Sequence, residues 1–398
     1  MTLRMPRANR RAFSAVAASS GTSLAAAVVA FIVNILMARH LGPESRGEVA
    51  WALQGAYVIA PLLALGVDRQ ALREPDRTSA ISQRHVWVLG ALGIAISLAF
   101  ASLPLAACVA TAAVGASLAI ERGTGMATGS LGRFVTLQMA IQVWVLVAST
   151  TLYVSNVNDP IWWLAAYAAP APVILLLSFR FAPRPRADDS LRQKVLGTVD
   201  RKSVTYMVGG FGTLMAARVE RLILPVLAST KELGLYVAIA TASEMLVWAA
   251  RGLGESRVVG FMTRTITRSS LARAAVRDFT YFLLLAAPLA AGIHFLLLPL
   301  LGPAFAQTEV LIVPLCLASA SWATYLQMSA VWLARGSVKQ SMRLDVSAAI
   351  LTALCVTALV PQYGALGAAI GCLVAYTAMV PVAVAFLPRV GEIEAPVE

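Results

Sequence analysis

The stretch VTYMVGGFGTLMAARVERLILPVL, residues 204–227, is apolar enough to cross a membrane over most of its length, yet it contains Arg218, Glu220 and Arg221. A charge in a membrane span is costly unless it pairs, reaches the interface or faces a water-filled cavity. The stretch therefore predicts a membrane helix that carries a functional site. At about 100° per residue its charges of opposite sign are expected to point in different directions. Gly209, Thr213, Ala216 and Glu220 share one face, and Met207, Phe211, Leu214, Arg218 and Arg221 share the other.

The composition of the whole chain indicates the same environment. Among 398 residues 59% are hydrophobic and 13% are charged, and the mean hydropathy is +0.75. These values exclude a water-soluble globule and predict an all-α polytopic membrane protein. The formal charge of +12 would indicate a nucleic-acid partner only on a folded basic domain, and the sequence contains none. The four cysteines lie in apolar runs without metal-type spacing, so we expect no metal and no cofactor beyond an ion or proton gradient.

Apolar runs of about 20 residues predict about twelve transmembrane helices. We place them near residues 15–38, 48–67, 86–103, 105–120, 134–154, 161–180, 204–227, 235–254, 279–301, 308–332, 344–361 and 364–387. Most basic residues then fall in cytoplasmic segments, whereas only Arg39, Arg46 and Lys231 fall in outer loops. This positive-inside pattern predicts a multi-pass protein of the inner or plasma membrane with both termini in the cytoplasm.

The chain divides into two halves at its longest hydrophilic gap. We predict an N-terminal six-helix bundle at 1–181, a cytoplasmic linker at 182–203 and a C-terminal six-helix bundle at 204–398. Short motifs recur in the same order in both halves: PESRG at 43–47 and KELG at 231–234, then TGSLGR at 128–133 and RGSVKQ at 335–340. A two-fold repeat of this kind predicts two bundles around a central cavity.

Four motifs carry a resemblance to a known family. They are ARHLGPESRG at 38–47, RVERLIL at 218–224 with ELGLY at 232–236, LLGPAF at 300–305 and YGALGAA at 363–369. Together they resemble polysaccharide and O-antigen-type flippases of the multidrug/oligosaccharidyl-lipid/polysaccharide exporter superfamily. The chain departs from that pattern in being short and in having Glu220 where Asp is usual.

The resemblance implies alternating access and movement of a polyprenyl-diphosphate-linked oligosaccharide from the inner to the outer leaflet. It also implies a lipid-linked glycan as substrate, membrane lipids as surroundings and other polysaccharide-assembly proteins as partners. We keep as an alternative a cation-coupled exporter of small organic molecules from the same superfamily. A membrane glycosyltransferase or ligase fits less well because the outer loops are too short to house its site, so we expect a transporter and no enzyme.

Two sets of candidate site residues follow from depth in the membrane. Arg218 and Arg221 are expected to bind the diphosphate, since a guanidinium fork suits phosphate oxygens. The rise of a helix also places Arg218 and Glu244 at similar depth on consecutive helices. As alternatives to diphosphate binding, these two residues could form a structural ion pair, or the arginines could reach outward to lipid headgroups. Glu220, Glu244 and His294 are candidates for ion coupling, and their alternative role is helix packing.

The charge pattern makes the topology testable. Cysteines introduced by Asp188→Cys and Lys231→Cys into a cysteine-free protein should react with impermeant reagents from opposite sides, position 188 from the cytoplasm and position 231 from outside. Accessibility of position 231 from the cytoplasm would contradict the twelve-span topology.

Overall fold

The computed structural model describes residues 7–70, 75–128, 130–180, 201–250, 253, 267–334 and 338–386. The described residues form helices joined by short turns, and none of them lies in a strand. This outcome follows from the apolar composition, because a helix satisfies its backbone hydrogen bonds internally where no water is present. The predicted all-α class is therefore confirmed.

The chain forms two compact units. Unit 1 contains the described residues of Met1–Leu41 and Glu48–Leu214, and unit 2 contains those of Gly42–Gly47 and Met215–Glu398. Most of the linker that we predicted at 182–203 lies outside the described residues, so the boundaries 1–181 and 204–398 stay predictions. The six residues 42–47 belong to unit 2, although the chain on both sides of them belongs to unit 1.

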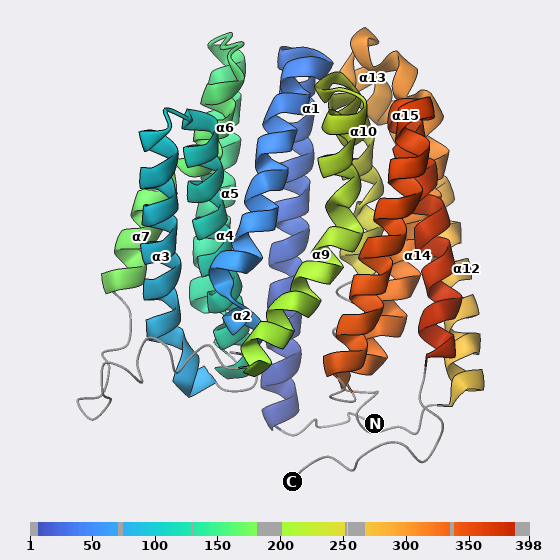
Figure 1. The fold of residues 1–398 in the computed structure, drawn as a ribbon, viewed down its shortest axis with the longest axis horizontal. Helices are drawn as coiled ribbons and strands as arrows, with labels where there is room; N and C mark the ends of the chain where they lie inside the picture. The colour runs from blue at the N-terminus through green and yellow to red at the C-terminus, as the bar shows by residue number, and fades with distance from the viewer. Residues whose placement is uncertain are drawn as a thin grey trace. The chain divides into compact units, whose positions relative to one another are not determined.

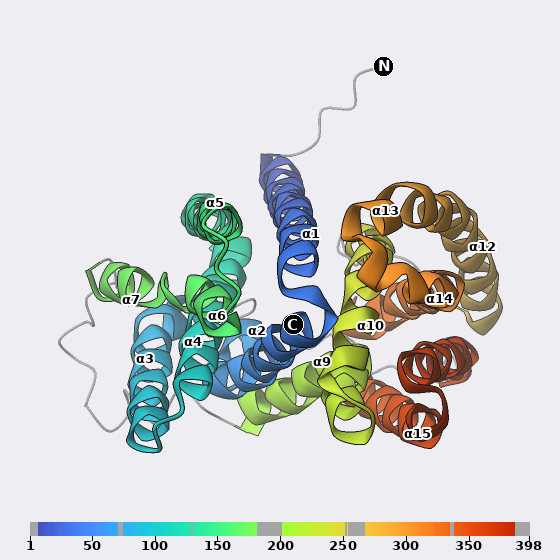
Figure 2. The same cartoon turned by 90° about the horizontal axis from the view of Figure 1, so that it is seen from above.

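Unit 1 is built around α4. Its elements are α1 (Arg7–Ala64, apart from Gly42–Gly47), α2 (Val67–Gln70), α3 (Pro75–Ala99), α4 (Leu103–Thr128), α5 (Gly132–Val154), α6 (Pro160–Ala168) and α7 (Ala171–Arg180). Helix α4 packs against α3, α5 and α6 (Figures 1 and 2). Its buried face consists largely of small residues such as Ala112, Ala113 and Ala116, which let neighbouring helices approach closely in a membrane.

Unit 2 is built around α14. Its elements are the second half of α9 (Arg201–Leu227), α10 (Thr230–Ser243), α12 (Arg268–Gly292), the π-helix η1 (Ile293–Leu297), α13 (Leu298–Leu301), the 3₁₀-helix η2 (Pro303–Thr308), α14 (Glu309–Ala334) and α15 (Val338–Ala385). Helix α14 contacts α10, α12 and α15, which surround it in both views (Figures 1 and 2). Most of its side chains are buried, and the polar Thr324 and Gln327 are fully so.

The helices agree with the twelve predicted spans. Eight helical stretches of the described residues are long and apolar enough to cross a membrane. Two of them, Leu24–Ala64 and Gln340–Ala385, are interrupted by non-helical glycines, Gly42 and Gly364, and so comprise two spans each. The apolar part of α3, Gln83–Ala99, is shorter, and α9 carries the three charges, so neither is among the eight. Where the structure describes them, the residues of each predicted span are thus largely helical.

The connection between the first two spans differs from the prediction. We expected PESRG at 43–47 to be a loop, but these residues are helical and the chain is broken at Gly42 alone, where φ is 69°. Glycine adopts this backbone conformation without the cost that a side chain would add. Pro43 then occupies the start of the next helix, where the missing N–H is not needed.

Three of the motifs that carry the family resemblance meet at one end of unit 2. A side-chain carbon on Gly47 would overlap the carbonyl oxygen of Thr230, and one on Gly234 would overlap that of Pro43. The segment Gly42–Gly47 and the start of α10 therefore touch backbone to backbone. Glu232 on α10 in turn accepts a hydrogen bond of 2.8 Å from the backbone N–H of Ala365 in α15.

The close approach at Gly234 predicts a specific sensitivity. Gly234→Ala should lower stability by about 1–3 kcal/mol, because the added methyl group meets backbone that cannot turn aside. Thermal unfolding of the purified protein measures the change. Gly292→Ala is the matched control, since nothing lies within 4 Å of its side-chain position, and a helical alanine there should be neutral or stabilising by up to about 1 kcal/mol. Equal melting temperatures for the two variants would contradict the close backbone packing at Gly234.

Candidate functional site

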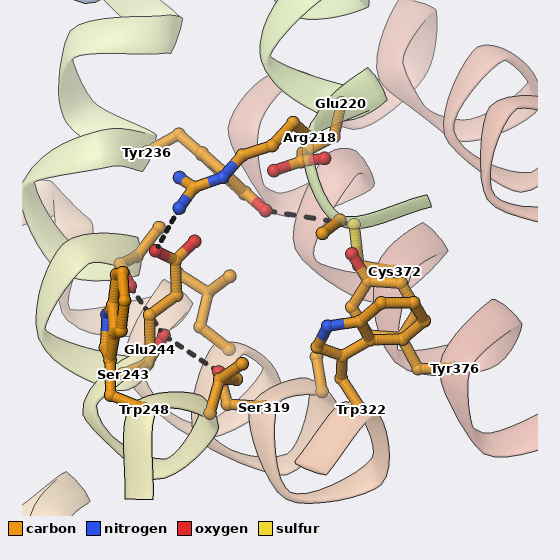
Figure 3. A pocket seen from close by; sticks show the side chains of 15 residues that line it. Arg218, Glu220, Tyr236, Ser243, Glu244, Trp248, Ser319, Trp322, Cys372 and Tyr376 are labelled. Carbon is orange, nitrogen blue, oxygen red and sulfur yellow. Dashed lines mark hydrogen bonds and ion pairs between the residues drawn. The ribbon is translucent and has the colours of Figure 1, made fainter. Parts of the chain in front are cut away.

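Unit 2 contains a pocket formed by α9, α10, α14 and α15. Arg218 and Glu220 enter it from α9, Glu244 from the end of α10, Trp322 from α14 and Tyr376 from α15 (Figure 3). Its volume is about 40 Å³, which is room for about two or three water molecules. The pocket brings four of the five predicted site residues to one place, three as lining residues and Arg221 directly behind them.

Glu244 is the centre of the charged cluster. Its Oε2 atom lies 3.0 Å from Nη2 of Arg218, and its Oε1 atom accepts a hydrogen bond from Nη2 of Arg221. The regular hydrogen bonding of α10 ends at this residue, and the helix resumes at Met245. The pair between Arg218 and Glu244 confirms the prediction that these two residues lie at the same depth on neighbouring helices.

The two arginines have different surroundings. Arg221 donates from Nε to Oε1 of Glu220 at 3.2 Å, and these two side chains are only 3% and 2% exposed. Arg218 and Glu244 are 17% and 19% exposed and face the pocket. Arg221 does not line the pocket, so the structure separates the two arginines that we had assigned together to a substrate.

The expectation that the charges of α9 point in different directions is wrong. Glu220 and Arg221 are consecutive residues, and on the helix their Cα–Cβ bonds diverge, yet their side chains bond to each other. The reason is the length of the arginine side chain, which bends around the helix surface to reach a carboxylate. In an apolar environment an unpaired charge costs more than this bend does.

Aromatic residues form the opposite wall of the pocket. Trp322 stacks on Tyr325 with ring centroids 4.9 Å apart and lies against Tyr376 at 4.8 Å. The Tyr376 hydroxyl donates to the carbonyl oxygen of Ala216 at 2.9 Å, which ties α15 to α9. We did not predict this wall from the sequence. The available signal was the presence of tryptophan and tyrosine, which carry polar atoms, inside otherwise apolar spans.

Two buried polar atoms of the pocket residues have no hydrogen-bond partner. They are Oε2 of Glu220 and Nε1 of Trp322, and both side chains are 2% exposed. A buried polar atom without a partner is destabilising and rare in native proteins. The pocket residues thus keep two unsatisfied buried polar atoms, an acceptor on Glu220 and a donor on Trp322.

His294 lies apart from the pocket. Its Nδ1 atom is 3.5 Å from Oε1 of Glu309, and the two side chains are 40% and 61% exposed. The residue belongs to the π-helix η1 and contacts Phe295 edge to face at 4.6 Å. The structure thus does not bring His294 together with Glu220 and Glu244, with which we had grouped it. Among the residues that the structure describes, no three His, Cys, Asp or Glu side chains are grouped as metal ligands.

Comparison with known proteins identifies the fold. No family model matches the chain, and no curated protein matches its sequence. An inward-facing multidrug resistance MATE family transporter of the MOP superfamily is 14% identical, with a TM-score of 0.65 over 92% of this chain and 97% of that one. An outward-facing MATE transporter of the same superfamily is 13% identical, with a TM-score of 0.64 over 94% of both chains. A mutant of the Vibrio cholerae MATE transporter VcmN is 16% identical, with a TM-score of 0.60 over 94% of both chains.

At these identities the likeness establishes a shared fold. The chain shares the all-helical fold of these three transporter structures, and the superfamily that its sequence motifs resemble stays a prediction. None of these three structures is described as a polysaccharide flippase, so that branch stays a prediction.

The different burial of the two arginines predicts different effects on stability. Arg221→Gln leaves a carboxylate without a partner in a buried place, which costs about 3–5 kcal/mol. Arg218→Gln should cost less, because its partner Glu244 keeps Arg221 and faces the pocket. Thermal unfolding in the same detergent compares the two variants. If Arg218→Gln were the more damaging change, Arg221 would not be the structural counter-ion.

Proposed function

We propose that this protein is a membrane exporter of small organic molecules that works by alternating access and is coupled to an ion or proton gradient. The fold supports an exporter, since it extends over more than nine tenths of chains described as multidrug resistance transporters in inward-facing and outward-facing conformations. A fold can host many substrates, so the argument for the substrate has to come from the site.

The charge that faces the pocket is the observation that carries the proposal. Two carboxylates, Glu220 and Glu244, line the pocket with a single guanidinium, that of Arg218, while Arg221 stays behind them. The wall opposite consists of Trp322 and Tyr376, whose ring faces attract cations. Carboxylates next to aromatic rings suit an organic cation with an apolar body better than they suit an anion.

The same carboxylates support coupling. A carboxylate within a membrane span can exchange a proton or a cation as the protein changes conformation. A proton bound to Glu220 or Glu244 would remove the charge that holds an organic cation, so proton uptake on one side would favour release of the substrate. His294 is not part of this proposal, because it lies away from both carboxylates.

A lipid-linked oligosaccharide is the second candidate substrate. Arg218 faces the pocket and offers N–H donors to a diphosphate, and the sequence motifs resemble those of polysaccharide flippases. This candidate keeps the lipid-linked glycan, membrane lipids and polysaccharide-assembly proteins as proposed partners. The two candidates differ in the sign of the charge that the pocket must hold.

Transport measurements separate the two candidates. Cells that contain the wild-type protein should expel a fluorescent organic cation, and Glu244→Gln should reduce the rate about tenfold or more, the effect of one lost charge-assisted hydrogen bond. Glu309→Gln is the control, since that carboxylate is 61% exposed and outside the pocket. Proteoliposomes that translocate a diphosphate-linked lipid but expel no organic cation would favour the flippase.

A further inference from the structure

The two oxygens of Glu244 are held in unequal ways. Oε1 bonds to Arg221, which is 3% exposed and is fixed from its other side by Glu220. Oε2 pairs with Arg218, which is 17% exposed and extends across the pocket wall from α9 to reach it (Figure 3). One oxygen is therefore tied to a buried partner, whereas the other is tied to a partner at the edge of open space.

The guanidinium of Arg218 takes up the space that a ligand of Glu244 would need. With Arg218 in place the pocket measures about 40 Å³, enough for water but too small for an organic molecule. A molecule that binds Glu244 from the pocket must therefore move Arg218 aside. Arg221 would still hold Oε1 in that state, so the carboxylate would keep its position.

Charge balance allows this exchange for a cation and opposes it for an anion. Arg218, Arg221, Glu220 and Glu244 sum to zero charge. A cation that replaces Arg218 at Oε2 leaves the buried cluster neutral once the arginine has moved toward water. An anion that pairs with Arg218 instead leaves Glu244 with one cation fewer, which is costly in an apolar span.

We propose that Arg218 is a built-in occupant of a cation site, and that an organic cation bearing N–H groups, a guanidine or a protonated amine, displaces it from Oε2 of Glu244. This inference rests on the proposed function and names the substrate class of the same site. Arg218 is then a specificity-determining residue that competes with the substrate, and it keeps the carboxylate paired when the site holds no substrate.

The hydrogen-bond acceptors of the pocket define the preferred cation. Oε2 of Glu244 lies 3.0 Å from Nη2 of the Arg218 guanidinium, and Oε2 of Glu220 has no hydrogen-bond partner. Both oxygens are hydrogen-bond acceptors and therefore favour a ligand with N–H donors, which a quaternary ammonium group lacks. Trp322 and Tyr376 would pack against the apolar part of the ligand. The site should therefore favour methylguanidine over tetramethylammonium, although both carry one positive charge.

Binding measurements on the full-length protein in lipid nanodiscs test this competition. Titration with methylguanidine should give weak binding to the wild type and binding about tenfold tighter or more to Arg218→Gln, because the competitor is gone. Arg218→Lys should remain weak, since an ammonium can still occupy Glu244. Glu244→Gln should abolish binding, and Arg343→Gln, an exposed arginine on α15, should match the wild type. Tetramethylammonium should bind the wild type and Arg218→Gln more weakly than methylguanidine does, because it lacks N–H donors.

The sign of the Arg218 effect decides the inference. Weaker methylguanidine binding to Arg218→Gln than to the wild type would show that Arg218 assists the ligand, and the inference would be overturned. Equal binding of tetramethylammonium and methylguanidine would overturn the N–H preference. If Arg218→Gln is too unstable to titrate, its melting temperature provides the second measurement. Methylguanidine at a few millimolar should raise it more than tetramethylammonium does, because a more tightly bound ligand stabilises the folded state more.

These outcomes are separate from the test of the proposed function. If the wild type expels a fluorescent cation but Arg218→Gln binds methylguanidine more weakly, the proposed exporter function stands and the competing role of Arg218 is overturned. If Arg218→Gln binds methylguanidine more tightly but cells with the wild-type protein expel no cation, the competing role of Arg218 stands and the proposed exporter function is overturned.

Discussion

The ion pairs around Glu244 are the interaction on which the rest of unit 2 depends. Four charges lie inside apolar helices, and each is tolerable there only while it has a partner. All four come from α9 and the end of α10, so these two helices have to stay in register for Arg218 and Arg221 to reach one carboxylate. Helices α14 and α15 add hydroxyl and aromatic groups but no further charge at the pocket. The neutrality of the cluster thus constrains how these helices pack.

A second constraint is the need to turn and bring helices together without exposing unpaired backbone to lipid. The chain meets it with glycine at a few positions. Gly42 and Gly364 adopt positive φ and break two long helices with almost no loop. Gly47 and Gly234 let two segments touch backbone to backbone. Because Glu232 then bonds to the N–H of Ala365, the break in α15 is held against α10, the helix that presents Glu244.

The shared fold and the individual site contribute different parts of the functional argument. The likeness to MATE transporters in inward-facing and outward-facing conformations concerns the arrangement of helices, and such an arrangement is compatible with substrates of either charge. In our proposal, the side chains of the pocket distinguish between them. In our proposal, Arg221 behind Glu244 acts as a structural counter-ion, whereas Arg218 in front of it competes with the substrate. That distinction depends on which guanidinium can reach water.

The sequence by itself determined the all-α class, the twelve spans and the shared depth of Arg218 and Glu244, because apolar length and helical rise are local properties. It misplaced the connection at 43–47 and the relative direction of Glu220 and Arg221, since a long side chain can bend against the helical period. Only the tertiary structure separated His294 from the cluster and brought Trp322 and Tyr376 to it from helices far along the chain. Which residues share a pocket depends on how distant helices pack, and no local pattern records that packing.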